Sequence, residues 1–275
     1  MKYENLIQEI ERKYKIDSMK VAAIYTDEVY IDVSLEDFNS ICAALHEKLK
    51  SAVMTLFAVD EGSERGLFTI ICVFMGVEYK KWFLARTRIN RDNPRFASLS
   101  KQIYSAAFFE REMKEMFGIE LIDNPDARSL RLHEEVWTEK NYPLRKDFTP
   151  SSGKDKTKKE YIFNRIEGEG VFEVPVGPVH AGIIGPGHFR FSAAGEPIIN
   201  LETRLGFTHR GIEKLFEGKK TGEAVKIAEH VCGDSSFSHS LAFCRAVEKI
   251  SGIIVPARDA YSREIFLELE RLYNH

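Results

Sequence analysis

The feature that most restricts the fold of this chain is a series of strand-like runs in its first third. Residues 52–59, 67–74 and 78–86 are rich in Val, Ile, Phe and Thr, the residue types that favour strands, and short turn-forming stretches separate them. This spacing predicts an antiparallel meander. A further pair of strands, 21–25 and 29–33, is predicted on either side of a tight turn at 26–28.

Two amphipathic segments flank these strands. Ser34 is a typical helix N-cap, and apolar residues then recur at helical spacing as far as Lys50. A second helix is predicted over 98–117, with Gly118 placed to end it. The first 148 residues are therefore expected to form an α+β domain with helices packed on an antiparallel sheet.

Residues 149–160 interrupt the pattern. This stretch is rich in lysine and has no apolar residue except proline, so we expect a solvated linker between residues 1–148 and 161–275. A nucleic-acid-binding arm is the alternative interpretation of such a run. The formal net charge of −3 disfavours it, and no nucleic-acid partner is expected.

Beyond the linker the pattern predicts a β-hairpin followed mainly by helices. Residues 189–191 and 197–205 flank the turn at 194–196, and glycine and proline crowd the loop before them. Helices are then predicted over 210–216, 223–230, 237–250 and from 256 onward. The last helical pattern reaches residue 275 without a cap, so we expect the sequence to hold only part of this domain.

Composition narrows the classes of protein that remain. Of the 275 residues, 44% are hydrophobic and 29% are charged, which is typical of a globular protein. The longest apolar run, 67–77, is too short to cross a bilayer, and the N-terminus lacks the apolar core of a secretory signal, so a cytoplasmic protein is expected. The four cysteines form no CxxC pair and complete no iron-sulfur or zinc ligand set.

The densest group of reactive side chains lies between His230 and His239, with Cys244 five residues further on. Two His and two Cys suit zinc, but their spacing along one segment is poor for such a site. A cysteine just before a helix also suits a nucleophile, if its pKa is lowered. An ordinary buried Cys232 beside a helix cap is the third alternative, and the residues alone leave all three open.

Several longer motifs resemble known families. The run from Phe109 to Leu121, the turn 124–128 and the segment 142–147 resemble the C subunit of respiratory complex I. After the linker, further motifs resemble the start of the D subunit of the same complex: 177–180, 186–190, 208–215, 255–258 and 267–271. Fused in this order, the two parts resemble the large subunit of group 4 nickel-iron hydrogenases, the formate hydrogenlyase type.

The chain also departs from the hydrogenase pattern. The family motif reads Arg-x-Cys-Gly-x-Cys-x-x-x-His, whereas this chain keeps Cys232 and His239 but has His230 for the arginine and Ser235 for the second cysteine. A serine hydroxyl does not bridge nickel and iron as a thiolate does, so the usual nickel-iron centre is not expected and Cys232 is the only retained ligand position. Gly185 also replaces a glutamate that serves proton transfer in these hydrogenases.

The resemblance implies a set of site residues. In complex I the cleft between the hairpin loop and the first helices of the D subunit admits a quinone head group. Carried over to this sequence, the cleft residues are His180, His188, Cys232, Asp234 and His239. Histidine and a His-Asp pair suit proton supply to a quinone near neutral pH.

Two other groups of charged residues carry weaker implications. His209, Arg210 and Glu213 either route protons or shape the cleft, although a Glu and an Arg three residues apart also form an ordinary ion pair on a helix. Residues 110–112 and 145–147 are expected to serve domain packing and subunit docking and are assigned no chemistry.

The resemblance thus implies a peripheral-arm subunit of an ion-translocating oxidoreductase complex, on the cytoplasmic face of the membrane. This chain would bind no cofactor itself. An iron-sulfur partner, similar to the B subunit of complex I or to the hydrogenase small subunit, would hold the cluster. NAD would bind elsewhere in the complex, and membrane subunits would move the ion. Two alternatives are an active nickel-iron hydrogenase with altered ligands and a scaffold that docks the cluster and membrane subunits.

Overall fold

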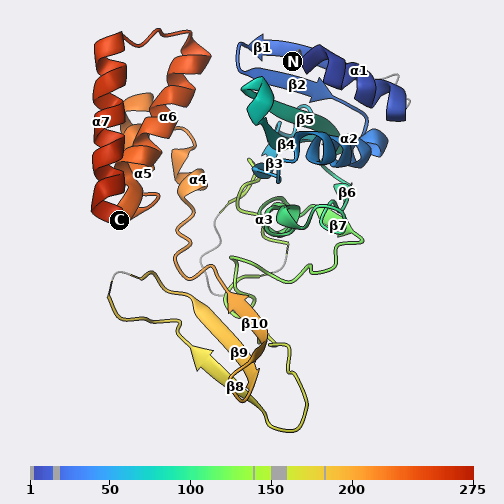
Figure 1. Ribbon diagram of the computed structural model, residues 1–275, viewed down its shortest axis with the longest axis vertical. Coiled ribbons are helices and arrows are strands. Elements are labelled where there is room, and N and C mark those ends of the chain that lie inside the picture. The colour runs from blue at the N-terminus through green and yellow to red at the C-terminus, as the bar shows by residue number, and fades with distance from the viewer. Residues whose placement is uncertain (1–2, 15–18, 139, 150–159, 183) are drawn as a thin grey trace. The chain divides into compact units, whose positions relative to one another are not determined.

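The computed structural model describes residues 3–14, 19–138, 140–149, 160–182 and 184–275 (Figure 1). The chain divides into two compact units, Met1–Thr208 and His209–His275. The predicted linker, 149–160, lies almost wholly outside the described residues, so the proposed division at that point stays a prediction. The sheet that follows it belongs to the first unit.

A five-stranded sheet forms the centre of the first unit. Its strands are β1 (Lys20–Tyr25), β2 (Glu28–Asp32), β3 (Thr55–Asp60), β4 (Leu67–Gly76) and β5 (Lys81–Asn90), in the order β1-β2-β5-β4-β3. The predicted meander and N-terminal pair are both confirmed, and all their pairings are antiparallel. β2 and β5 are parallel, which was not predicted, because β5 reaches β2 only after the chain has passed through a helix and two strands.

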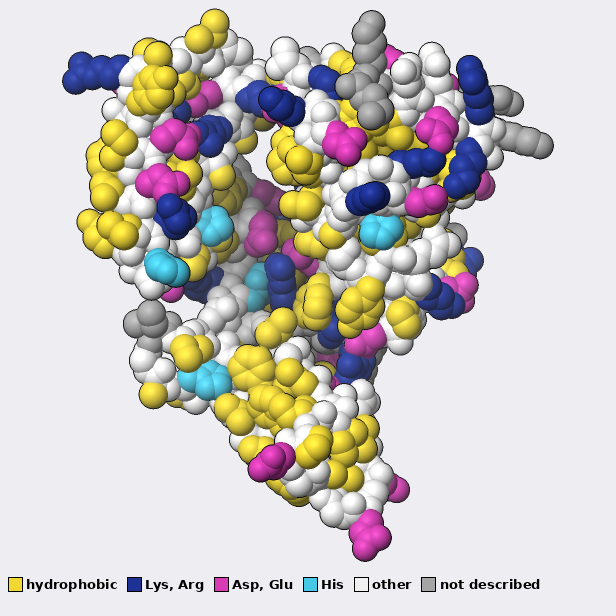
Figure 2. Space-filling view, in the orientation of Figure 1, with side chains coloured by type: hydrophobic (Ala, Val, Ile, Leu, Met, Phe, Trp, Pro, Cys, Tyr) yellow, Lys and Arg dark blue, Asp and Glu magenta, His cyan; other side chains and the backbone are white. Residues whose placement is uncertain are grey.

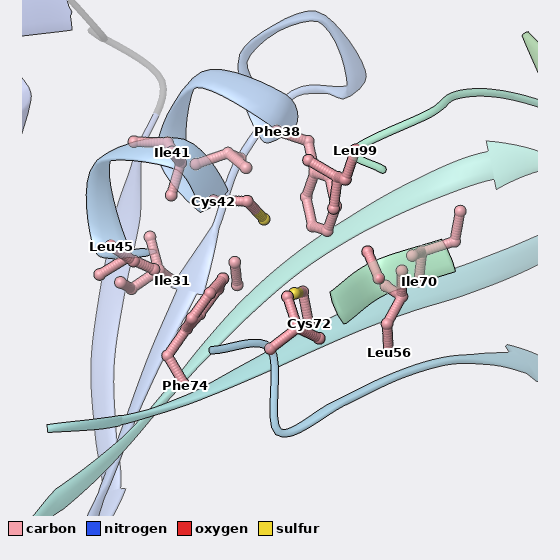
Figure 3. Close-up of a cluster of buried hydrophobic side chains, with 14 of the residues drawn as sticks. Ile31, Phe38, Ile41, Cys42, Leu45, Leu56, Ile70, Cys72, Phe74 and Leu99 are labelled. Atoms are coloured by element: carbon pink, nitrogen blue, oxygen red, sulfur yellow. The ribbon is translucent and has the colours of Figure 1, made fainter. Parts of the chain in front are cut away.

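Two helices pack with this sheet around one hydrophobic core. α1 (Tyr3–Tyr14) was not predicted, whereas α2 (Leu35–Leu49) has the predicted limits. The Ser34 hydroxyl accepts from the amide of Asp37 at 3.1 Å, and Lys50 ends the helix in the left-handed conformation. Figure 3 shows side chains of α2, such as Phe38 and Cys42, pointing toward the strands that carry Cys72 and Phe74, and all four are fully buried.

The second predicted helix is shorter than expected. A single turn of 3₁₀-helix (η2, Tyr104–Ala106) leads into α3 (Ala107–Phe117), while residues 98–103 are not helical. They are held instead by Glu110, whose carboxylate accepts from the Leu99 amide at 2.6 Å. Gly118 ends α3 with φ of 72°, and a Cβ there would lie 2.4 Å from the ring of Tyr142, so only glycine fits. Short parallel strands, β6 (Arg95–Ala97) and β7 (Glu120–Ile122), flank the helix.

A separate three-stranded antiparallel sheet consists of β8 (Val171–Val176), β9 (His188–Ala194) and β10 (Ile198–Arg204), with β9 in the centre. The predicted hairpin is confirmed as β9–β10, and β8 was not predicted. One face of β9 carries His188, Arg190 and Ser192, and the other carries apolar residues. Figure 2 shows hydrophobic side chains gathered over these strands. Phe172 of β8 and Leu201 of β10 are about half exposed.

The second unit is helical, as predicted. It contains α4 (Ile212–Phe216), α5 (Thr221–Glu229), a 3₁₀ turn (η3, Gly233–Ser235), α6 (Ser236–Ser251) and α7 (Ala257–Asn274). α6 packs against both α5 and α7, and the rings of Phe216 and Phe243 stack at 5.4 Å between centroids. None of the helices in the described parts of the chain is long and apolar enough to span a bilayer. The predicted α+β fold class is confirmed.

Candidate functional site

The charged residues 110–112 of α3 hold the neighbouring loops in place through hydrogen bonds. Glu110 is fully buried and accepts from Ser98 Oγ and Asn124 Nδ2 at 2.6 and 2.7 Å, in addition to the Leu99 amide. Burial raises the pKa of Glu110, although these hydrogen bonds oppose the shift. Arg111 donates to the carbonyl oxygens of Arg128 and Ser129 at 2.8 and 2.7 Å. These contacts agree with the packing role expected for this motif.

The motif at 145–147 also makes structural contacts. Arg145 Nε donates to the carbonyl of Phe117 at 2.7 Å. Asp147 pairs at 2.5 Å with Arg91, which also binds the buried Asp60, and the amide of Lys146 donates to Asp60 at 2.8 Å. The segment is therefore tied to the end of α3 and to the five-stranded sheet.

Arg128 links the five-stranded domain to the three-stranded sheet. It forms a bidentate pair with Asp126, both bonds 2.8 Å long, and also binds Glu202 on β10. Hydrogen bonds from Arg128 lower the pKa of Asp126 to about 2. Nearby, Arg204 of β10 pairs with Glu135 at 2.5 Å. The two parts that the sequence placed on either side of a linker are thus joined by ion pairs within the first unit.

The predicted residues His180 and His188 meet at the neck of the loop between β8 and β9. His180 Nε2 lies 2.7 Å from the carbonyl oxygen of Gly187, and His188 Nδ1 lies 3.2 Å from that of Gly177. Because a carbonyl oxygen only accepts, each of these nitrogens carries a proton. Each histidine is therefore anchored to the opposite side of the loop.

Glycine is required at the same neck. Gly177 has φ of 81°, and a Cβ there would lie 2.1 Å from the Gly187 carbonyl and 2.7 Å from His180 Nε2. The amide of Gly187 donates to the carbonyl of Pro178 at 2.9 Å and closes the loop. A side chain at position 177 would separate the two strands and displace His180.

The polar face of β9 contains buried atoms without hydrogen-bond partners. Among the described residues these atoms are His188 Nε2, Arg190 Nε and Ser192 Oγ. They stand at alternate positions of one strand, so all three point to the same face of the sheet. Buried polar groups are nearly always paired, so this row differs from the other described residues of the first unit.

The other predicted residues, Cys232, Asp234 and His239, lie in the second unit at the start of α6. Cys232 precedes η3 and is partly exposed, and its carbonyl accepts from the Ser235 amide at 3.2 Å. His239 lies one turn into α6 and is partly buried. The loop histidines belong to the first unit, and this segment belongs to the second.

A residue that the sequence did not single out, Glu270 of α7, holds this segment. Its carboxylate accepts from the amides of Phe237 and Ser238 at 2.6 and 3.0 Å, and from Ser238 Oγ at 2.6 Å. Slight burial opposes its ionisation, but these hydrogen bonds outweigh it and lower the pKa of Glu270. Glu270 thus caps the N-terminus of α6 from another helix.

The remaining predicted group is His209, Arg210 and Glu213. Arg210 donates to the carbonyl oxygens of His230 and Val231, the latter at 3.1 Å, and so tethers the chain just before Cys232. The roles expected for this group, proton routing or cleft shaping, stay predictions. His209 and Glu213 also have partners within the structure.

Within the part of the chain that the structure describes, no three His, Cys, Asp or Glu side chains are grouped so that they could hold a metal ion. Cys42 and Cys72 lie in the core of the five-stranded domain, and Cys244 lies further along α6.

Two family models match different parts of the chain. Residues 31–154 match the 30 kDa subunit of respiratory-chain NADH dehydrogenase, and residues 210–275 match nickel-dependent hydrogenase. The first match covers most of the five-stranded domain with α3. The second coincides with the helical unit.

Individual relatives agree with these matches. Formate hydrogenlyase subunit 5 of Escherichia coli is 33% identical over 256 residues, which are 90% of this chain and 45% of that protein. The C/D subunit of NADH-quinone oxidoreductase from Phocaeicola vulgatus is 31% identical over 208 residues, 68% of this chain and 39% of that protein. The chain therefore spans less than half the length of these two relatives. A chain of the membrane-bound sulfane sulfur reductase, an archaeal respiratory membrane complex, covers 59% of this chain with a TM-score of 0.47 and 18% identity, and all of that chain is matched.

Proposed function

The chain carries a domain of the NADH dehydrogenase 30 kDa subunit family followed by a nickel-dependent hydrogenase domain, and from this premise we propose that it is a peripheral-arm subunit of a membrane-associated oxidoreductase complex. Its relatives are named as subunits of such enzymes. In the proposed reaction, electrons pass from an iron-sulfur cluster in a partner subunit to a quinone-like or other small acceptor. Membrane subunits of the complex couple the reaction to ion movement.

The observation that carries this proposal is the order of the two domains in one chain. The ion pairs of Arg128 and Arg204 support it, because they join the first domain to the strands that bear the loop histidines. A subunit that must hold an acceptor site in register with a partner cluster needs such a rigid junction.

We further propose that this chain binds no nickel-iron centre. Support comes from the chemistry of the donors, since Ser235 stands where the family motif has its second cysteine. Nickel and iron require thiolates as bridging ligands, and a serine hydroxyl does not fit that role. The chemistry of the chain itself is then hydrogen bonding and proton supply to the acceptor, for which His180, His188 and His239 are the candidate groups.

The first experiment is metal analysis with redox spectroscopy of the protein purified with its partners. Iron in the amount required by the partner clusters, without nickel, is the expected result. Stoichiometric nickel would favour the alternative of an active hydrogenase with altered ligands and would contradict the argument from Ser235.

A variant separates electron transfer from scaffolding. His239→Ala should reduce turnover of the assembled complex by about a hundredfold or more, the usual effect of losing a proton donor, while assembly stays intact. His230→Gln is the matched control, because this side chain is exposed and contacts the carbonyl of Lys226, one turn back, at 2.6 Å. Unchanged turnover in His239→Ala would leave a docking scaffold as the better function.

A further inference from the structure

An extended segment lies against the polar face of β9. We call residues 160–164 the strap. Phe163 of the strap has its ring centroid 5.0 Å from that of His188 and 4.2 Å from the guanidinium carbon of Arg190. The ring therefore covers two neighbouring side chains of the row that contains the unpartnered buried atoms.

Nε2 of His188, whose ring lies against Phe163, is buried without a hydrogen-bond partner among the described residues. His188 is only 8% exposed, its Nδ1 proton is donated to the carbonyl of Gly177, and its Nε2 has no partner among the described residues. In a neutral imidazole with the proton on Nδ1, Nε2 is an acceptor. A buried acceptor left unpaired costs free energy, so this nitrogen favours a ligand that donates a hydrogen bond to it.

Glu202 holds the strap in place. Its Oε1 accepts from Tyr161 Oη at 2.6 Å, and its Oε2 accepts from the amide of Asn164 at 2.8 Å. These two anchors lie on either side of Phe163. Glu202 is itself 6% exposed and bound by Arg128, so the strap is fixed to the ion pairs that join the two parts of the first unit.

We propose that the strap is a cover over Nε2 of His188, with Phe163 as a positioning residue for the imidazole and Glu202 as the anchor that keeps the cover closed. The inference rests on the proposed function only in taking Nε2 as the nitrogen that accepts a hydrogen bond from a hydroxyl group of the acceptor in its reduced form. Opening of the strap then controls access to that nitrogen. Local opening of this segment breaks the two hydrogen bonds to Glu202 and the ring contacts of Phe163, but no helix or sheet hydrogen bonds, because the segment belongs to no helix or strand.

Chemical modification of the purified full chain tests the cover. Diethyl pyrocarbonate acylates unprotonated imidazole nitrogens, and peptide mapping resolves each histidine. Phe163→Ala should increase the rate at His188 by about tenfold or more, while the neighbouring Ile162→Ala should not, because Ile162 is 82% exposed. In Phe163→Tyr, which keeps an aromatic ring at this position, His188 should be acylated as slowly as in the wild type. Equal rates at His188 in wild type and Phe163→Ala would overturn the proposal.

Two further measurements guard against a merely structural effect. Glu202→Gln keeps one accepting oxygen and should give a smaller increase than Phe163→Ala. ¹⁵N spectra of histidine-labelled protein should show the Nδ1–H tautomer of His188 in wild type and a mixture of tautomers in Phe163→Ala. If Phe163→Ala lowers the unfolding midpoint, Phe163→Leu, which keeps the apolar volume but not the ring, provides the same comparison.

The outcome is independent of whether the chain takes part in electron transfer, because the modification needs no acceptor. A protected His188 together with His239→Ala turnover equal to wild type would refute the proposed function and leave the cover intact. A His188 that reacts freely in wild type would refute the cover and leave the proposed function untouched.

Discussion

The five-stranded domain and the three-stranded sheet differ in two respects: how far their apolar side chains are buried, and whether their buried polar atoms have hydrogen-bond partners. In the first, the core residues are almost fully buried, and the buried Glu110 is satisfied by three protein donors. In the second, Phe172, Leu201 and Ile199 are about half exposed, while the described atoms His188 Nε2, Arg190 Nε and Ser192 Oγ are buried without partners. The five-stranded domain is stabilised by contacts among its own residues. The three-stranded sheet instead has exposed apolar side chains and unpartnered polar atoms that a bound molecule could contact.

The largest expected difference is in core packing. Phe38 is fully buried and meets Phe96 edge to face at 5.8 Å. Phe38→Ala should lower the free energy of unfolding by about 3–5 kcal/mol, and Phe172→Ala, at a residue that is 49% exposed, by less than about 1 kcal/mol. Urea unfolding of the two variants measures both values. Similar losses would mean that the sheet is packed as the core is.

The next comparison concerns two carboxylates that accept from backbone amides. Glu110→Ala leaves buried donors unpaired and should cost about 2–4 kcal/mol, whereas Glu270→Ala exposes the end of α6 to water and should cost about 1 kcal/mol. Hydrogen exchange at Leu99 and at Phe237 reports each site separately. If the Glu270 variant lost as much stability as the Glu110 variant, the helical unit would depend on that cap as the first domain depends on its buried network.

The smallest expected effect is a pH dependence at the junction. The pKa of Asp126 falls from its ordinary 3.8 to about 2 in the folded chain, because Arg128 binds the ionised form. The stability that Asp126 contributes is therefore present above about pH 4 and is lost as the pH falls toward 2. Asp126→Asn should lower the unfolding midpoint at about pH 5, and the difference from wild type should shrink at about pH 2.5. A constant difference would show that the carboxylate charge is irrelevant.

The sequence predicted the elements whose signals are local. Ser34 and Lys50 mark both ends of α2, and α6 ends at Ser251, one residue beyond its predicted limit, with Gly252 in the left-handed conformation at φ of 67°. Four elements were missed. The strand β8 contains Pro175 and the strands β6 and β7 have three residues each, so their patterns are weak. α1 was missed although its buried residues Leu6, Ile7 and Ile10 have helical spacing. The start of α3 was predicted too early, because the apolar spacing of 98–103 does not reveal that Glu110 captures that segment.

The site was predicted only in part for a related reason. The motifs identified His180 and His188, and the structure brings both to one loop neck. Phe163, Glu202 and Glu270 were not found, because each acts on residues that are distant along the chain. Their only sequence signals were an aromatic residue after the linker and acidic residues within a strand and a helix, and acidic residues are common on solvated surfaces.

The parallel pairing of β2 and β5 also governs the order in which this chain can fold. β5 lies at the centre of the sheet, between β2 and β4, yet it is the last of the five strands to leave the ribosome. Until residues 81–90 emerge, the β1–β2 and β3–β4 hairpins have no common partner and each presents an unpaired edge. Completion of the sheet during synthesis is therefore a single late event, and a pause in translation before residue 90 prolongs the interval in which those edges are open to other chains.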